Sequence, residues 1–203
     1  MRFTTIALIV AAISLSACDD KPAAPQASTP EPVAKPALTE QQRADLIAKA
    51  THGMEVNRDK MEKVSFYTPR IPLEEWANQP LGVYLSIPDG YRVIFRVHPH
   101  YTGSDWIFFQ KIKVMADDQI VYEREFPYAD MVRTNSYGSV YESTDYAAKD
   151  ADIEAMRKIA AAKSVTVRLS GRENQRDYEM SKADQQRIAQ ALKAYDELQP
   201  LSS

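Results

Sequence analysis

The sequence predicts an α+β fold, with a mostly antiparallel sheet of hairpins and with helices packed on one face. The expected elements follow the order helix, hairpins, helix, hairpin, helix, without the strand-helix alternation that builds parallel sheets. Turn signals at Pro88-Asp89-Gly90 and Asp117-Asp118 lie between runs of β-branched and aromatic residues. Once the N-terminal segment is set aside, the length favours a single domain of about 150 residues, which can bury a core without cross-links.

The chain is predicted to begin with a signal peptide over residues 1–17. Arg2 precedes an apolar run over residues 6–15 that is too short to span a bilayer as a stable helix. The next motif, Leu15-Ser16-Ala17-Cys18, places an apolar residue and two small residues before the only cysteine. It resembles the lipobox of bacterial lipoproteins. The resemblance implies that Cys18 becomes the mature N-terminus and carries acyl chains such as palmitate.

An alternative interpretation of this segment is an ordinary secretory signal cut after Ala17, which would leave Cys18 as a free thiol. A lone thiol is unusual in an oxidising compartment, so the lipid anchor is favoured. If Cys18 forms the anchor, the chain has no cysteine for an intrachain disulfide, and packing alone must hold the core.

Residues 18–38 are predicted to form the lipidated cysteine and a Pro/Ala-rich tether. Five prolines and few apolar side chains favour an extended chain over a packed one. Asp19 and Asp20 resemble the signal that retains enteric lipoproteins in the inner membrane, although they could also simply begin the linker. The expected location is therefore the periplasmic face of the inner membrane, in preference to the outer membrane.

The single α+β globular domain is predicted over residues 39–203. A capping box, Thr39-Glu40-Gln41-Gln42, starts a helix that Gly53 ends, and a strand follows over residues 64–67. Residues 74–76 are expected to form a turn or helical stub, and residues 82–87 and 91–98 the first hairpin. The expected core face of its second strand consists of Tyr91, Val93, Phe95 and Val97. A second hairpin within residues 106–126 is expected at the centre of the sheet, with a core face of Trp106, Phe108, Ile112 and Val114.

In the C-terminal half, residues 139–143 are predicted as a strand and the rest of 128–146 as a loop. A helix over residues 150–163, a hairpin over 165–180 and a final helix capped at Ser181 complete the domain. The expected buried stripe of the final helix is Ile188, Ala191, Leu192, Tyr195 and Leu198. Some patterns in this domain resemble those of secreted bacterial domains to which no activity is assigned. They are Asp59-Lys60-Met61-Glu62 with Tyr67-Thr68-Pro69, Trp106-Ile107-Phe108 and Arg168-Leu169-Ser170-Gly171.

The candidate binding residues lie in a tyrosine-rich stretch. Aromatic rings, a guanidinium and amides gather there, and tyrosine and arginine are enriched where proteins bind one another. The residues named for this role are Arg133, Asn135, Tyr137, Tyr141 and Glu142. The alternative is that these tyrosines pack on strands with their hydroxyls at the rim.

No catalytic residues, metal or cofactor are predicted. His98 and His100 could reach one ion from the same face of a strand, with Asp105 or His52 as a third ligand, but two surface histidines beside a turn are the commoner meaning. The sequence has no nucleophile elbow and no glycine-rich phosphate loop. A net charge of −3 and the lack of a basic stripe argue against nucleic acid as a partner.

The function predicted from these observations is that of a non-catalytic lipoprotein, anchored in the membrane, that serves as a binding or accessory module for an envelope protein. The alternative is a module that binds a small molecule or a glycan, such as a peptidoglycan fragment, against the region from Arg133 to Glu142. An unrecognised hydrolase is a third possibility, which would require a pocket holding a histidine beside a carboxylate.

Overall fold

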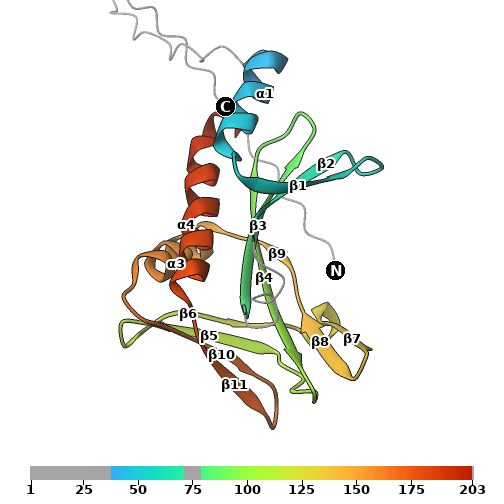
Figure 1. Ribbon diagram of the computed structural model, residues 1–203, viewed down its shortest axis with the longest axis vertical. Coiled ribbons are helices and arrows are strands. Elements are labelled where there is room, and N and C mark those ends of the chain that lie inside the picture. The colour runs from blue at the N-terminus through green and yellow to red at the C-terminus, as the bar shows by residue number, and fades with distance from the viewer. Residues whose placement is uncertain (1–37, 71–78, 203) are drawn as a thin grey trace, which may run out of the picture. The chain divides into compact units, whose positions relative to one another are not determined.

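The computed structural model describes residues 38–70 and 79–202, and within them it confirms an α+β fold (Figure 1). The expected signal peptide, lipobox, Asp19, Asp20 and tether up to residue 37 lie outside the described residues, as does the stub expected at 74–76. The elements in chain order are α1 (Glu40–Ala50), β1 (Met54–Asp59), β2 (Val64–Pro69), β3 (Leu81–Pro88), β4 (Ile94–Gly103), β5 (Lys111–Ala116), β6 (Gln119–Glu125), η1 (Tyr128–Asp130), β7 (Val132–Ser136), β8 (Ser139–Ser143), β9 (Tyr146–Ala147), α3 (Asp150–Ala161), β10 (Val165–Ser170), β11 (Gln175–Glu179), α4 (Lys182–Glu197) and η2 (Gln199–Ser202).

The strands form two antiparallel sheets, where the sequence led us to expect one. The larger sheet has the order β1-β2-β3-β4-β8-β7, with the short strand β9 also paired to β4. The smaller sheet has the order β11-β10-β5-β6. The chain passes from the first sheet to the second between the end of β4 at Gly103 and the start of β5 at Lys111. The hairpin β5–β6 therefore belongs to the smaller sheet, where β5 is internal and β6 is an edge strand.

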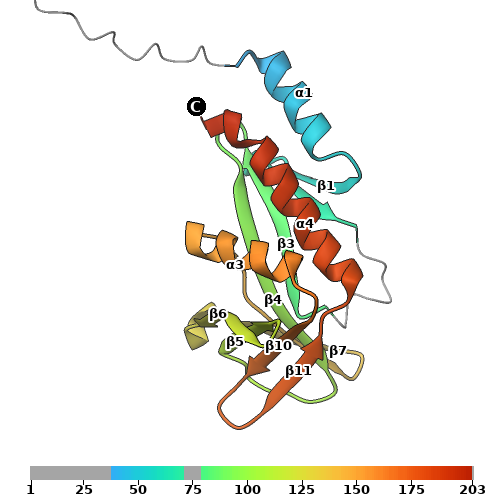
Figure 2. The same cartoon turned by 90° about the vertical axis from the view of Figure 1, so that its left-hand side faces the viewer.

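Helices α3 and α4 pack against each other and each covers one sheet (Figure 2). Helix α4 lies on β2, β3 and β4, and α3 contacts β5 and β6. The sheet face under α4 carries the buried Val83, Leu85, Phe95 and Val97. The predicted stripe of α4 is confirmed, because Ile188, Ala191, Leu192 and Leu198 are buried and Tyr195 meets Phe95 edge to face at 5.7 Å.

The predicted helix starts are confirmed. In α1 the backbone N–H of Gln42 donates to the Thr39 hydroxyl at 3.2 Å, and the side-chain oxygen of Gln42 accepts from the backbone N–H of Thr39 at 3.0 Å. In α4 the Asp184 N–H donates to the Ser181 hydroxyl at 3.1 Å. Each contact satisfies a backbone donor that a helix start otherwise leaves unpaired.

Both predicted hairpin turns are also confirmed. Strands β3 and β4 pair antiparallel around residues 88–90, where Gly90 has a φ of +75°. Strands β5 and β6 pair around Asp117 and Asp118, both of which have positive φ. The Asp117 carboxylate accepts hydrogen bonds from the backbone N–H groups of Lys163 and Ser164, which ties this turn to the start of β10.

Three expectations about strands were wrong. Residues 106–110 are not part of a strand, and Phe108 has a φ of +50° with 45% of its surface exposed. Residues 132–136, expected as loop, form β7. Tyr91, expected in the core, is exposed ahead of β4. The rest of the two predicted core faces is buried at Val93, Phe95, Val97, Ile112 and Val114, with Trp106 half-buried.

Candidate functional site

The five candidate binding residues lie on one hairpin formed by β7 and β8. The strands pair antiparallel from Val132↔Ser143 to Ser136↔Ser139, so the hairpin closes with the two residues Tyr137 and Gly138. Their φ angles of +49° and +79° define a type I′ turn, whose twist matches that of the flanking strands. The sequence stretch thus forms one structural unit, but its side chains do not share one surface.

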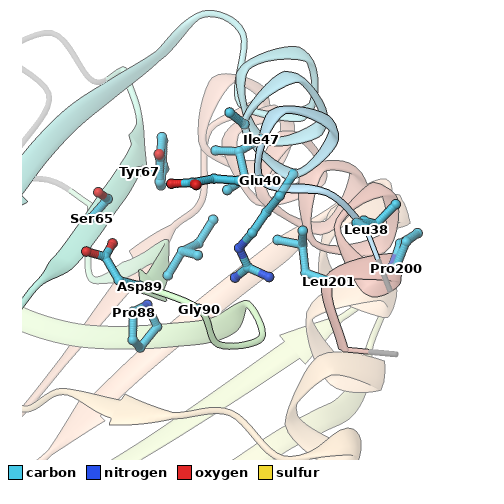
Figure 3. A pocket seen from close by; sticks show the side chains of 13 residues that line it. Leu38, Glu40, Ile47, Ser65, Tyr67, Pro88, Asp89, Gly90, Pro200 and Leu201 are labelled. Atoms are coloured by element: carbon cyan, nitrogen blue, oxygen red, sulfur yellow. The ribbon is translucent and has the colours of Figure 1, made fainter. Parts of the chain in front are cut away.

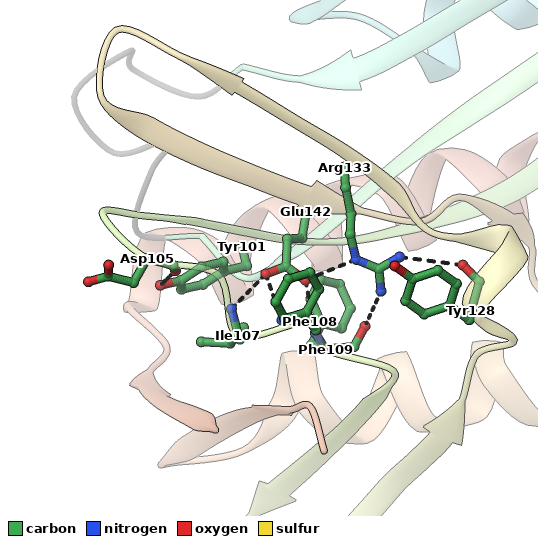
Figure 4. Close-up of polar contacts among 8 residues, drawn as sticks. All are labelled: Tyr101, Asp105, Ile107, Phe108, Phe109, Tyr128, Arg133 and Glu142. Carbon is green, nitrogen blue, oxygen red and sulfur yellow. Dashed lines mark hydrogen bonds and ion pairs between the residues drawn. The ribbon is translucent and has the colours of Figure 1, made fainter. Parts of the chain in front are cut away.

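The alternation of strand residues separates the candidates onto two faces. Arg133 and Glu142 are cross-strand neighbours on the inner face, directed toward residues 107–109 (Figure 4). Tyr141 pairs with Thr134 on the outer face, where both are exposed. Tyr137 stands at the tip with an exposed fraction of 104%. Asn135 lies two residues from Arg133 along β7, on the same face of the strand, but it is exposed.

Glu142 is fully buried, with 0% of its surface exposed, and its carboxylate accepts three backbone hydrogen bonds. Oε1 accepts from the N–H groups of Ile107 and Phe108, both at 2.8 Å, and Oε2 accepts from Phe109 N–H at 2.9 Å. Successive N–H groups that converge in this way form an anion-binding concavity, and the left-handed backbone of Phe108 is part of that geometry. Glu142 therefore fastens the hairpin to the segment between the two sheets.

Arg133 completes this buried contact. Its Nε lies 3.6 Å from Glu142 Oε2, and its two terminal nitrogens donate long hydrogen bonds of 3.4 Å to the carbonyl oxygens of Tyr128 and Phe109. The guanidinium carbon lies 4.2 Å from the ring centroid of Tyr128 and 5.8 Å from that of Phe108. Stacking on rings and pairing with a carboxylate are both suited to the flat, weakly hydrated guanidinium. Arg133 and Glu142 are thus engaged with the protein itself.

Two exposed apolar groups remain around this contact. The hairpin surface consists of the exposed side chains on the outer face and tip of the hairpin: Val132, Thr134, Tyr137 and Tyr141. The aromatic rim consists of Phe108 and Tyr128, which lie beside Arg133, and of Trp106, which stacks on Phe108 with the ring centroids 5.7 Å apart. The contact of Phe108 with Arg133 was not foreseen, because Phe108 was expected in the core.

The weak metal candidates His98 and His100 do lie together on β4. Their rings stack with centroids 5.4 Å apart. Burial, and to a lesser extent the neighbouring His100, lowers the pKa of His98 below its ordinary value. The other proposed ligand, Asp105, accepts from the hydroxyl of Ser104 through its carboxylate and from that of Tyr101 through its backbone carbonyl. Across residues 38–70 and 79–202 no group of three or more His, Cys, Asp or Glu side chains could hold a metal ion.

A groove on the outer face of the larger sheet has a volume of about 380 Å³. The edge-to-face rings of Phe66 and Tyr84 contribute to it, together with His98 and Asp145. The Asp145 carboxylate accepts from the Tyr84 hydroxyl and from Arg96, whose Nε lies 2.8 Å away. Burial and this hydrogen bond raise the pKa of Tyr84 to about 12. The groove thus combines apolar rings with fixed polar groups.

A larger pocket of about 630 Å³ lies between α1, β2, the β3–β4 turn and the C-terminal η2 (Figure 3). Its lining mixes the charges of Glu40, Arg43 and Asp89 with apolar Ile47 and Leu201. Arg43 donates to the carbonyl of Tyr91. Asp89 accepts two hydrogen bonds from Arg58, at 2.6 and 2.8 Å, and this contact lowers the pKa of the Asp89 carboxyl. The charged groups on this side are therefore largely paired within the protein.

The fold and the hairpin place this chain among α+β proteins built on antiparallel sheets. Comparison with known proteins adds no name to that class, since no family model, no curated protein and no solved structure matches the chain. Over the residues that the structure describes, no helix is long and apolar enough to cross a membrane.

Proposed function

We propose that this chain is a lipid-anchored lipoprotein of the cell envelope whose globular domain is a non-catalytic binding module for another envelope protein. In this proposal the hairpin surface, with Tyr137 at its tip, contacts the partner. The anchor at Cys18 and the inner-membrane location rest on the sequence motifs alone. The binding role rests on Tyr137.

Tyr137 is the main support for the proposal, because its backbone is strained and its side chain makes no buried contact within the protein that would offset the strain. The first central residue of a type I′ turn requires positive φ, and Asn, Asp or Gly is favoured there. Tyrosine in the left-handed region is strained, and its ring at 104% exposure gains no burial. Strained, exposed aromatic side chains are a mark of functional sites, and tyrosine is enriched in the contacts that dominate protein interfaces.

The base of the hairpin supports the same proposal. A binding side chain is most effective when the element that carries it is held in one geometry before the partner arrives. The Glu142 carboxylate, with its three backbone hydrogen bonds, provides such a fixed base below Tyr137. The partner would therefore meet a preorganised surface.

The proposal is tested by crosslinking and pulldown from the native envelope, with inner and outer membranes separated. The chain is compared with its Tyr137→Arg variant. Tyr91→Arg is the matched control, since Tyr91 is also exposed beside a hairpin turn but on the β3–β4 loop. We expect one stoichiometric partner that Tyr137→Arg loses and Tyr91→Arg keeps. Equal recovery with all three chains would refute a role for the hairpin surface.

The anchor is tested in the same fractions with a Cys18→Ala variant. We expect the natural chain to sediment with the inner membrane and the variant to remain soluble, because two or more acyl chains hold a protein stably on a bilayer and none remain in the variant. A natural chain that fails to sediment with any membrane would refute the lipoprotein assignment.

A second candidate function, binding of a glycan or small molecule, is favoured by the groove at Phe66 and Tyr84. From the sequence we expected such a ligand to bind against the region from Arg133 to Glu142, but these two side chains pair with each other inside the protein. A sugar could stack on the rings and bond to the polar groups of the groove. Calorimetric titration with soluble peptidoglycan fragments tests this candidate: saturable binding that Phe66→Ala abolishes would support it, and heat no greater than dilution would exclude it.

A further inference from the structure

Apart from the two-residue strand β9, which pairs with β4, the two sheets end in four outermost strands within the described residues, and three of these carry exposed charges. Strand β1 presents Glu55 and Arg58, β6 presents Glu123 and Glu125, and β11 presents Arg176, Asp177 and Glu179. Charged side chains along an edge strand discourage pairing with a further strand, because the incoming chain would have to strip their water. These three edges are therefore protected.

The fourth outermost strand, β7, lacks this protection. Its exposed residues Val132, Thr134, Asn135 and Ser136 are uncharged. Its single charge, Arg133, is only 12% exposed and is turned inward to Glu142. An uncharged edge strand that presents unpaired backbone groups is a template for another strand.

The register shows which backbone groups of β7 face outward. The two-residue turn closes on the pair Ser136↔Ser139, which exchanges hydrogen bonds in hairpins of this kind. Because bonded pairs alternate along an antiparallel ladder, residues 132, 134 and 136 direct their N–H and C=O toward β8. The same groups of Arg133 and Asn135 then point away from the sheet and are available to a further strand.

We propose that β7 pairs antiparallel with β7 of a second copy of this chain, about a twofold axis at Thr134. In this register Arg133 of each copy exchanges two hydrogen bonds with Asn135 of the other, and Thr134 faces Thr134. No charge meets a like charge, since Arg133 lies opposite an amide. The strand is therefore complementary to itself in this one register.

The exposed apolar residues at the two ends of β7 fit the same arrangement. Val132 begins the strand and Tyr137 follows it, and both are exposed. In the twofold register Val132 lies opposite Ser136 of the second copy, directly beside that copy's Tyr137. At each end of the new ladder, Val132 of one copy and Tyr137 of the other can thus cover each other.

The expected association is weak in dilute solution, because five paired residues bury less than the roughly 1,600 Å² of a standard stable interface. Confinement to a membrane surface would raise the effective concentration without any new contact. That last step alone rests on the proposed lipid anchor. The pairing itself is independent of the proposed partner, and it would place two hairpin surfaces side by side on one face of a continuous sheet.

The test uses the full chain with Cys18→Ala, which removes its only cysteine, and adds a single thiol on β7. In a Thr134→Cys variant the two thiols face each other across the axis. Their Cα atoms would be about 4.5 Å apart, within the range of a disulfide. The matched controls are Asn135→Cys, on the same strand but not opposite itself, and Asn57→Cys, exposed on the β1 edge. Each variant is oxidised in air with copper phenanthroline, and dimers are quantified on non-reducing gels.

We expect Thr134→Cys to form disulfide dimers at least about tenfold faster than either control, because only this thiol is held against its own copy. Equal rates for the three variants would overturn the proposal. So would faster crosslinking of Asn135→Cys, which would indicate another register or another partner strand.

A second measurement keeps the proposal independent of the engineered thiol. Sedimentation equilibrium compares Asn135→Pro, which removes one outward N–H, with Asn135→Ala, which retains it. Proline is tolerated at an edge strand where its N–H is not needed within the sheet. We expect self-association of the natural chain and of Asn135→Ala, and a monomer for Asn135→Pro with an unchanged circular dichroism spectrum. Equal association of all three would refute edge pairing, whereas the pulldown with Tyr137→Arg separately decides the proposed partner.

Discussion

Arg133 and Glu142 lie opposite each other on β7 and β8, with Arg133 Nε 3.6 Å from Glu142 Oε2. Neither side chain is available to a ligand, because the carboxylate is buried under three backbone N–H groups and the guanidinium lies between the rings of Phe108 and Tyr128. Their pairing fixes the hairpin to the segment that joins the two sheets. The two most polar members of the predicted binding set thus hold the surface in place and leave binding to its tyrosines.

Replacement of Glu142 by Gln is expected to lower the free energy of unfolding by about 3 kcal/mol, since removal of one partner from a buried pair leaves the other charge uncompensated. The amide would also place an NH₂ group against backbone donors. Urea denaturation followed by circular dichroism measures the loss. The control is Glu125→Gln on the edge of β6, where the side chain is 78% exposed and a change within about 0.5 kcal/mol is expected. A similar small effect at Glu142 would contradict the role assigned to it.

Gly171 supports the same segment from the other side. A Cβ at this position would lie 1.8 Å from the Ile107 carbonyl oxygen and 2.8 Å from that of Phe108, and these carbonyls belong to the backbone segment whose N–H groups bind the Glu142 carboxylate. Gly171→Ala is therefore expected to cost about 2 kcal/mol of stability, because a packed backbone must move. Gly90→Ala is the comparison, since nothing lies within 4 Å of its Cβ and only its positive φ opposes the change, at about 1 kcal/mol. Thermal unfolding of both variants checks the order.

Much of the fold could be predicted because it is specified locally. The capping box at Thr39, the turn residues at Gly90 and Asp117, and the helical spacing in α4 each act within a few neighbouring residues. These elements depend on steric and hydrogen-bonding preferences that a short stretch of sequence displays. The α+β class follows from their order along the chain.

The errors arise where distant residues decide the structure. Residues 106–110 alternate as a strand would, but the N–H groups of 107–109 bond to Glu142, which lies more than thirty positions along the chain. Strand β7 contains Arg133, Asn135 and Ser136, whose polarity is typical of a loop, and only its pairing with β8 makes it a strand. The tyrosines of this stretch indicated a candidate site from the sequence alone. The buried role of Arg133 and Glu142 could not be predicted, because it depends on the long-range contact with residues 107–109.

Tyr137 is expected to show a trade-off between stability and binding. Tyr137→Asn places a residue that tolerates positive φ at the first central position of the turn, so the free energy of unfolding should rise by about 1 kcal/mol. Tyr137→Ala keeps the backbone penalty and removes the ring, so it should bring no such gain. Both variants should lose the partner in the pulldown. A tyrosine that proved more stabilising than asparagine would remove the main support for a functional role.

The pH dependence of stability is expected to report His98. Burial, with a smaller effect from His100, lowers the pKa of this imidazole in the folded chain below 6.5, whereas the unfolded chain keeps the ordinary value. Between these two pKa values the unfolded state binds more protons than the folded state. The contribution of neutral His98 to the free energy of unfolding is therefore fully present above about pH 6.5 and is lost as the pH falls toward the folded pKa. The slope of the free energy of unfolding against pH can reach about 1.4 kcal/mol per pH unit.

Urea denaturation between pH 8 and pH 5, at about half-unit steps, compares the natural chain with His98→Gln, which cannot titrate. His52 and His100 are present in both proteins, so the difference between the two curves reports the loss of His98 together with its charge interaction with His100. The carboxyl groups of Asp89, Glu123 and Asp177, whose pKa values ion pairs lower, titrate below this window. Identical slopes for the two proteins would show that His98 is not held neutral by its surroundings.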